Sequence, residues 1–139
     1  MVEIINNLKE EQEVILTKVE YLANDYRNYP EQAELDYEDK IDIKEINTNG
    51  ILLSVERMVK SPNNVIFSIF VSFDIKLWFK SRYEEDSFIT NDELLAIAKE
   101  NKDLFFGTCM AKISLIISEI SAQIGRGIPI ITPPQIINE

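Results

Sequence analysis

The sequence has 139 residues, of which 45% are hydrophobic, enough for one folded domain with a sizeable core. Its 24 acidic and 14 basic residues give a formal net charge of −10, which argues against nucleic acid or an anionic membrane as the main partner. There is no histidine and only one cysteine, Cys109. These counts exclude histidine-based triads, histidine-ligated zinc, CxxC redox chemistry and an internal disulfide.

The start of the chain indicates where the protein resides. Residues 1–13 are rich in glutamate and lack the basic start and apolar block of a signal peptide. No uncharged apolar run reaches the roughly 18 residues that span a bilayer. We therefore expect a soluble cytoplasmic protein, whose free thiol suits a reducing compartment. One domain over residues 1–139 is expected, in which residues 1–13 are the part most open to loose ordering.

The first half of the chain predicts three strands. The first fits Val14 to Tyr26, although a helix from Ile4 through Leu16 is an open alternative. The second lies around Leu35 to Ile46, with Ile41 and Ile43 pointing inward. The turn residues Asn47-Thr48-Asn49-Gly50 join it to a third strand over Ile51 to Lys60, because Asn and Gly tolerate the backbone of tight hairpins.

A fourth strand is predicted most clearly. Every odd position from Val65 to Phe79 is apolar, which indicates a strand with one strongly buried face. The even positions mix Ile66, Phe70 and Trp78 with polar residues, so this face is at least partly wet. The segment Ser61-Pro62-Asn63-Asn64 is the turn that pairs this strand with the third.

After Tyr83 the period becomes helical. Thr90 and Glu93 form a capping box, which begins a short helix through Leu94 to Ala98. A longer helix follows from about Leu104 to Ile124, with apolar residues at 113, 116, 117, 120 and 124 on one face, and ends at Gly125-Arg126-Gly127. The segment Ile128 to Pro134 is apolar and extended, because its prolines lack amide donors. The fold class is therefore α+β, a four-stranded antiparallel sheet followed by helices packed on one face.

No pattern in the chain indicates catalysis. Cys109 has no histidine base, so we interpret it as structural. The acidic clusters Glu34 to Asp39 and Glu84 to Asp86 lack the spacing of a calcium loop and are interpreted as solvated charge. The chain contains neither a Walker loop nor a dinucleotide fingerprint. We expect no enzyme, no catalytic residue, no cofactor and no metal.

The chain has more apolar residues than the core of one small sheet needs. The long helix, the aromatic residues Phe70 and Trp78, and the Ile-Pro-Ile-Ile tail exceed what one small sheet can cover. A large uncovered apolar surface usually marks a subunit interface or a binding groove. For a groove, chemistry and position single out Phe70, Trp78, Ile128, Ile130, Ile131, Tyr21 and Tyr26.

The chain resembles the SecB family of protein-export chaperones from about Val14 to Pro134. The best local signal is the Gly-Arg-Gly turn after the long helix, followed by the apolar segment that ends in Pro133-Pro134. A second signal is the opening strand that ends in Tyr29-Pro30. The order of four strands and then a long helix is similar as well. The combination of these signals carries the resemblance.

The resemblance implies a homotetramer, a dimer of dimers with the long helices between two outer sheets. It also implies an ATP-independent holdase that binds unfolded or extended polypeptide in apolar grooves and delivers it to the SecA motor for export. Apolar and aromatic walls suit this activity because they bind extended segments with little sequence preference.

Two departures from the family weaken the expectation of a SecA partner. The family continues past the proline segment into another helix and a tail that can hold zinc, whereas this sequence ends at Glu139. Asn24 and Asn28 stand where the family places carboxylates that dock SecA. Shorter SecB-like proteins include chaperones dedicated to an antitoxin. The alternative hypothesis is therefore an oligomeric adaptor or a dedicated chaperone for one partner, with no role in export.

Overall fold

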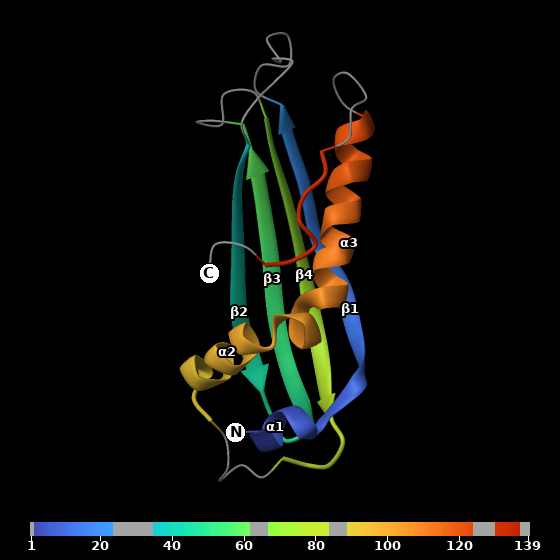
Figure 1. Ribbon diagram of the computed structural model, residues 1–139. Helices are drawn as coiled ribbons and strands as arrows, with labels where there is room; N and C mark the ends of the chain where they lie inside the picture. The colour runs from blue at the N-terminus through green and yellow to red at the C-terminus, as the bar shows by residue number, and fades with distance from the viewer. Residues whose placement is uncertain (1, 24–34, 62–66, 84–88, 124–129, 137–139) are drawn as a thin grey trace.

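The computed structural model describes residues 2–23, 35–61, 67–83, 89–123 and 130–136. Within these residues the helices and strands, in chain order, are α1 (Val2–Asn6), β1 (Leu8–Ala23), β2 (Asp36–Ile46), β3 (Gly50–Lys60), β4 (Phe67–Phe79), α2 (Asn91–Glu100) and α3 (Lys102–Gln123). The strands form one sheet in the order β1-β4-β3-β2, and every neighbouring pair is antiparallel (Figure 1). The predicted fold class is confirmed.

The first strand begins earlier than its pattern indicates. Strand β1 starts at Leu8, and only α1 precedes it, so the alternative of a helix through Leu16 is wrong. The apolar positions of β1 do not mark where the strand begins, because the strand lies at an edge of the sheet and is largely exposed. An edge strand has only one paired side, and its pattern is correspondingly weak.

Strand β4 lies between β1 and β3, and its alternation is the clearest in the chain. Its odd-numbered residues, from Phe67 to Phe79, are at most 6% exposed. They pair with the odd-numbered residues of β3, as Phe73 does with Val55, so both strands present one apolar face on the same side of the sheet. The buried core cluster contains this face, which we call the inner face.

The predicted turn between β2 and β3 is present. The side-chain oxygen of Asn47 accepts hydrogen bonds from the amides of Asn49 and Gly50, at 2.8 and 3.1 Å, and the Asn47 amide donates to the Gly50 carbonyl. Such side-chain bonds to the following backbone are the reason why asparagine favours turns. The core of the predicted turn between β3 and β4, residues 62–64, lies outside the described residues.

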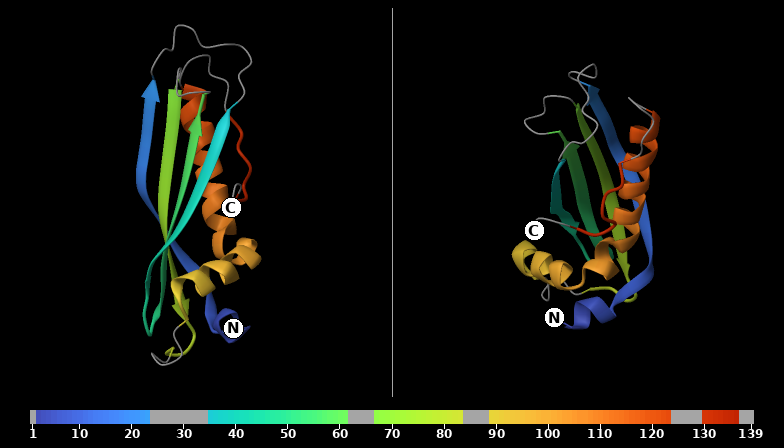
Figure 2. Two further views of the ribbon diagram at one scale, coloured as in Figure 1. Left: turned by 90° about the vertical axis from the view of Figure 1, so that its left-hand side faces the viewer. Right: turned by 45° about the horizontal axis from the view of Figure 1, so that its top comes forward.

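The helices cover the inner face, as the two further views show (Figure 2). Thr90 caps α2, because its hydroxyl oxygen accepts a hydrogen bond from the Glu93 amide at 3.1 Å, and it also bonds the Glu93 carboxylate. Helix α3 packs along β4 with a buried row that begins earlier than predicted: Phe105, Phe106, Cys109, Met110, Ile113, Ile117 and Ser121. The predicted turn at residues 125–127 lies outside the described residues.

Helix α3 also meets the length and composition of a helix that could cross a membrane. The core helix of a soluble protein passes the same test, and here the buried row of α3 faces the sheet.

Two glycines provide a sharp test of this packing. A methyl group at Gly50 would lie 2.1 Å from the backbone oxygen of Leu77, whereas one at Gly107 in α3 would meet nothing within 4 Å. We expect Gly50→Ala to lower the free energy of unfolding by about 3 kcal/mol, because the strand backbone cannot yield. Gly107→Ala should raise it by about 0.5 to 1 kcal/mol through helix propensity. Urea denaturation measures both, and equal effects would contradict this packing.

Candidate functional site

The described residues among those predicted to bind polypeptide do not share one surface. Phe70 and Trp78 belong to the even positions of β4 and point to the outer face, which no described helix covers. Tyr21 pairs with the buried Ile69 and therefore points to the inner face. Ile130 is half-buried against the core, and Ile131 is 73% exposed. Tyr26 and Ile128 lie outside the described residues.

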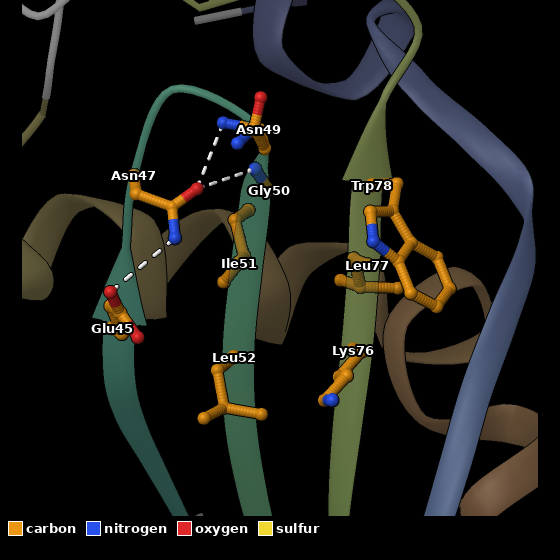
Figure 3. A pocket seen from close by; sticks show the side chains of 9 residues that line it. All are labelled: Glu45, Asn47, Asn49, Gly50, Ile51, Leu52, Lys76, Leu77 and Trp78. Carbon is orange, nitrogen blue, oxygen red and sulfur yellow. Dashed lines mark hydrogen bonds between the residues drawn. The ribbon is translucent and has the colours of Figure 1, made fainter.

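Trp78 lines a shallow pocket at the end of the sheet where β2 turns into β3 (Figure 3). The pocket has a volume of about 250 Å³ and is lined by Glu45, Asn47, Asn49, Gly50, Ile51, Leu52, Lys76, Leu77 and Trp78. The indole ring and the Leu52 side chain offer apolar surface, while Glu45 and Lys76 carry opposite charges at the rim. This combination suits a short apolar side chain, which would contact the apolar lining while the backbone of its segment remains exposed to solvent.

Phe70 lines a second shallow pocket, of about 140 Å³, with Met58 beside it on β3. The Lys18 ammonium lies 5.5 Å from the centre of the Phe70 ring, within the range of a cation–π contact. At a rise of about 3.3 Å per residue, Phe70 and Trp78 are roughly 26 Å apart along β4. The outer face between them is polar and contains an ion pair of 2.9 Å between Lys44 and Asp74.

A further apolar surface lies on α3. Leu104 and Leu115 are 43% and 59% exposed, and with the exposed Thr108 and Ala111 they follow the spacing of one helical stripe. The buried row of α3 lies on the opposite side of the helix, so this stripe points away from the sheet. No charged residue occupies the stripe. It is therefore a surface suited to another apolar partner.

The sequence analysis missed a buried arginine on the inner face. Arg57 of β3 is fully buried, and its Nε and Nη2 atoms each donate to one carboxylate oxygen of Asp39 at 2.7 Å. A shift of register between Ile43 and Glu45 creates this pair. An unbroken ladder from the turn would place Lys40 opposite Arg57, whereas the shift places Asp39 there. The available signal was that Arg57 is the one charged residue among the inward-facing, alternate positions of β3, which are otherwise apolar.

The remaining donors of Arg57 hold the last described segment of the chain, residues 130–136, which we call the tail. Its Nη1 atom donates to the Thr132 hydroxyl at 3.0 Å and to the Pro133 carbonyl, and its Nη2 atom donates to the Gln135 carbonyl at 2.7 Å. Two serines of α3 add to this network. Ser114 donates to the Pro133 carbonyl at 3.0 Å, and Ser121 accepts from the Ile130 amide at 2.6 Å.

The interpretation of the first acidic cluster as solvated charge is therefore wrong for Asp39. Its side chain is fully buried, because the register places it on the inner face opposite Arg57. The neighbours Asp36 and Glu38 are exposed, in accordance with that interpretation. The second cluster, Glu84 to Asp86, lies outside the described residues. Among the described residues, no group of acidic or cysteine side chains is arranged to hold a metal.

Cys109 is a structural residue. Its side chain is fully buried on the core side of α3, and burial raises the pKa of its thiol to about 12. The thiol is therefore protonated at neutral pH and is a poor nucleophile.

The buried pair allows a test by a double-mutant cycle. We expect Asp39→Leu or Arg57→Met alone to lower the free energy of unfolding by about 3 to 5 kcal/mol, because each leaves an uncompensated buried charge. The double variant should lose less than the sum of the two, since it leaves no such charge. Urea denaturation of the four proteins measures the coupling. Additive losses would contradict a direct buried pair.

The fold has a relative among solved structures. A SecB-like chaperone from Mycobacterium tuberculosis, in complex with a peptide from the HigA1 antitoxin, matches 95% of this chain and 93% of its own, with a TM-score of 0.66 and 8% identity. A protein of unknown function from Streptococcus agalactiae matches with a TM-score of 0.47 and 10% identity, over 91% of this chain and 98% of its own. No protein-family model and no curated protein sequence matches the chain. Because the sheet, the following helices and nearly the whole length coincide with the mycobacterial protein, the chain has the SecB-like fold.

Proposed function

We propose that the protein is a cytoplasmic, ATP-independent chaperone that holds unfolded or extended polypeptide segments. The observation that carries the proposal is the pair of half-buried aromatic residues, Phe70 and Trp78, on the uncovered outer face of one strand. Neither belongs to the core cluster, and each lines a shallow pocket. Two apolar anchors about 26 Å apart match an extended segment of about eight residues, at 3.3 Å per residue.

The chemistry of the outer face supports binding with little sequence preference. Aromatic rings and Met58 accept apolar side chains of many shapes, because Met is flexible and the rings offer large surfaces. The polar middle of the face keeps the exposed sheet soluble. We expect no catalytic step in this activity.

The protein is proposed to act as an oligomer, a dimer of dimers. The uncharged stripe of α3 is a surface that a second copy would cover, and the β1 edge strand exposes Leu16, Val19 and Leu22 by 39 to 52%. Exposed apolar residues on an unpaired edge favour association with another chain. Delivery to SecA is not part of the proposal, because Asn24 and Asn28 stand where the family presents docking carboxylates.

A second candidate function is a chaperone or adaptor dedicated to one partner. The observation that favours it is the complex of the mycobacterial relative with a peptide from an antitoxin. The two functions differ in selectivity. A general holdase binds several unrelated unfolded chains, whereas a dedicated chaperone binds one.

Two matched variants separate client binding from self-assembly. We expect Trp78→Ser to weaken binding of a reduced, carboxymethylated protein about tenfold, or about 1.4 kcal/mol, without changing the oligomer mass. Leu115→Ser on the α3 stripe should lower the oligomer mass. Size-exclusion chromatography with light scattering, with and without the unfolded chain, measures both effects.

The folded, disulfide-intact form of the same client is the control and should not co-elute. If Trp78→Ser abolishes the oligomer or the fold, Trp78 belongs to an interface or to the core, and the proposed outer-face site is wrong. Binding of a single client among several unrelated unfolded chains would favour the dedicated chaperone.

A further inference from the structure

The geometry points to a second polypeptide-binding site on the inner face, which the tail of this chain occupies and which a client segment takes by displacing it. The site consists of Arg57, Ser114 and Ser121, and its ligand is an unfolded polypeptide segment recognised through its backbone. This inference rests on the proposed function and deepens it, because it names where and how part of a client is held.

The contacts with the tail are mainly backbone recognition. The Pro133 and Gln135 carbonyls, two residues apart, accept from the Nη1 and Nη2 atoms of one guanidinium, the second at 2.7 Å. Ser114 adds a second donor to the Pro133 carbonyl, at 3.0 Å. The tail bends at Pro134 and Gln135, so one guanidinium reaches both carbonyls from a bent segment, and an unfolded chain that adopts the same bend can present its own carbonyls in this way.

The only tail side chain in this hydrogen-bond network is Thr132, whose hydroxyl bonds Arg57 and Ser114. Every residue of an unfolded client has a carbonyl, including proline, so donors on Arg57 and Ser114 impose little sequence preference. Ser121 accepts from the tail amide of Ile130 and would accept equally from a client amide.

The tail is held in a way that allows exchange. Residues 130–136 belong to no helix or strand, and no backbone–backbone hydrogen bond joins them to the other described residues. Side chains hold the tail instead, together with the buried Ile136. A segment anchored by a few side-chain contacts opens more easily than a strand within a ladder.

The tail also covers a part of the sheet that α3 does not. Figure 1 shows it leaving the side of α3 and crossing in front of β4 and β3 toward β2, and Figure 2 places it on the same face as α3. Arg57 bonds the tail, and the buried Val55 and Val59 flank Arg57 on the inner face of β3. Release of the tail would free the Arg57 donors beside this apolar part of β3, a combination that suits a polypeptide segment.

A disulfide that locks the tail tests the inference. The Ser114 and Thr132 hydroxyl oxygens are 3.1 Å apart, so Ser114→Cys with Thr132→Cys places two thiols within bonding reach. Buried Cys109, whose pKa is raised to about 12, should stay out of the exchange. The probes are a labelled peptide with the sequence of residues 128–138 and a reduced, carboxymethylated protein.

We expect the oxidised double variant to bind both probes at least tenfold more weakly than the same protein after reduction. The reduced protein controls for the loss of the two hydroxyls. Equal binding of the tail peptide in both states would overturn the inference. If the tail peptide responds to the lock but wild type ignores every unfolded chain, the exchangeable site stands and the proposed holdase function fails.

A second variant decides the matter if the disulfide does not form. Ile136→Ser removes the buried anchor of the tail but none of the receptor groups, so it should raise the affinity for the tail peptide three- to tenfold by increasing the open fraction. Ile5→Ser is the control, because it removes a half-buried isoleucine of α1 that packs against the core but is not part of the tail. If both variants raise the affinity equally, general loosening explains the gain and the inference is wrong.

Discussion

The guanidinium of Arg57 is the constraint on which the arrangement of the inner face depends. A buried charge is costly unless it is paired and its donors are satisfied, and here Asp39 neutralises it while the tail carbonyls and hydroxyls take its other donors. One side chain thereby connects β2, β3, α3 and the tail. An apolar residue at position 57 would bury well against the core, but it would give the tail no fixed path. The pair therefore specifies where the tail lies more than it adds stability.

Local chemistry in the sequence was enough to predict the sheet and the helices. The strict alternation of β4, the Asn47 turn and the Thr90 cap each depend on residues within a few positions of one another, and all three are present. The pattern of β1 was weaker because an edge strand has one paired side and water on much of its surface. Its start was misplaced for that reason.

The site was less predictable because it depends on register. The register shift between Ile43 and Glu45 decides whether Arg57 lies opposite Lys40 or Asp39, and no local sequence pattern predicts this shift. A second shift, between Leu16 and Lys18, exchanges the faces of β1, so that Leu16 and Val19 both point inward beside Phe73 and Val71. Each shift moves a whole set of side chains to the other face. Phe70 and Trp78 were placed on one face correctly because β4 itself is regular.

The two proposed sites, one on each face of the sheet, would hold a chain by complementary means. On the outer face, the proposed site uses Phe70 and Trp78 as apolar anchors, which would recognise side chains without fixing a direction. On the inner face, Arg57 and Ser114 donate to tail carbonyls, and in the inferred second site they would recognise client carbonyls without selecting side chains. A protein with apolar anchors alone would be prone to aggregate. A protein with hydrogen-bond donors alone would bind weakly, since each hydrogen bond contributes little net free energy in competition with water. A net charge of −10 would limit self-aggregation of a protein that combines both.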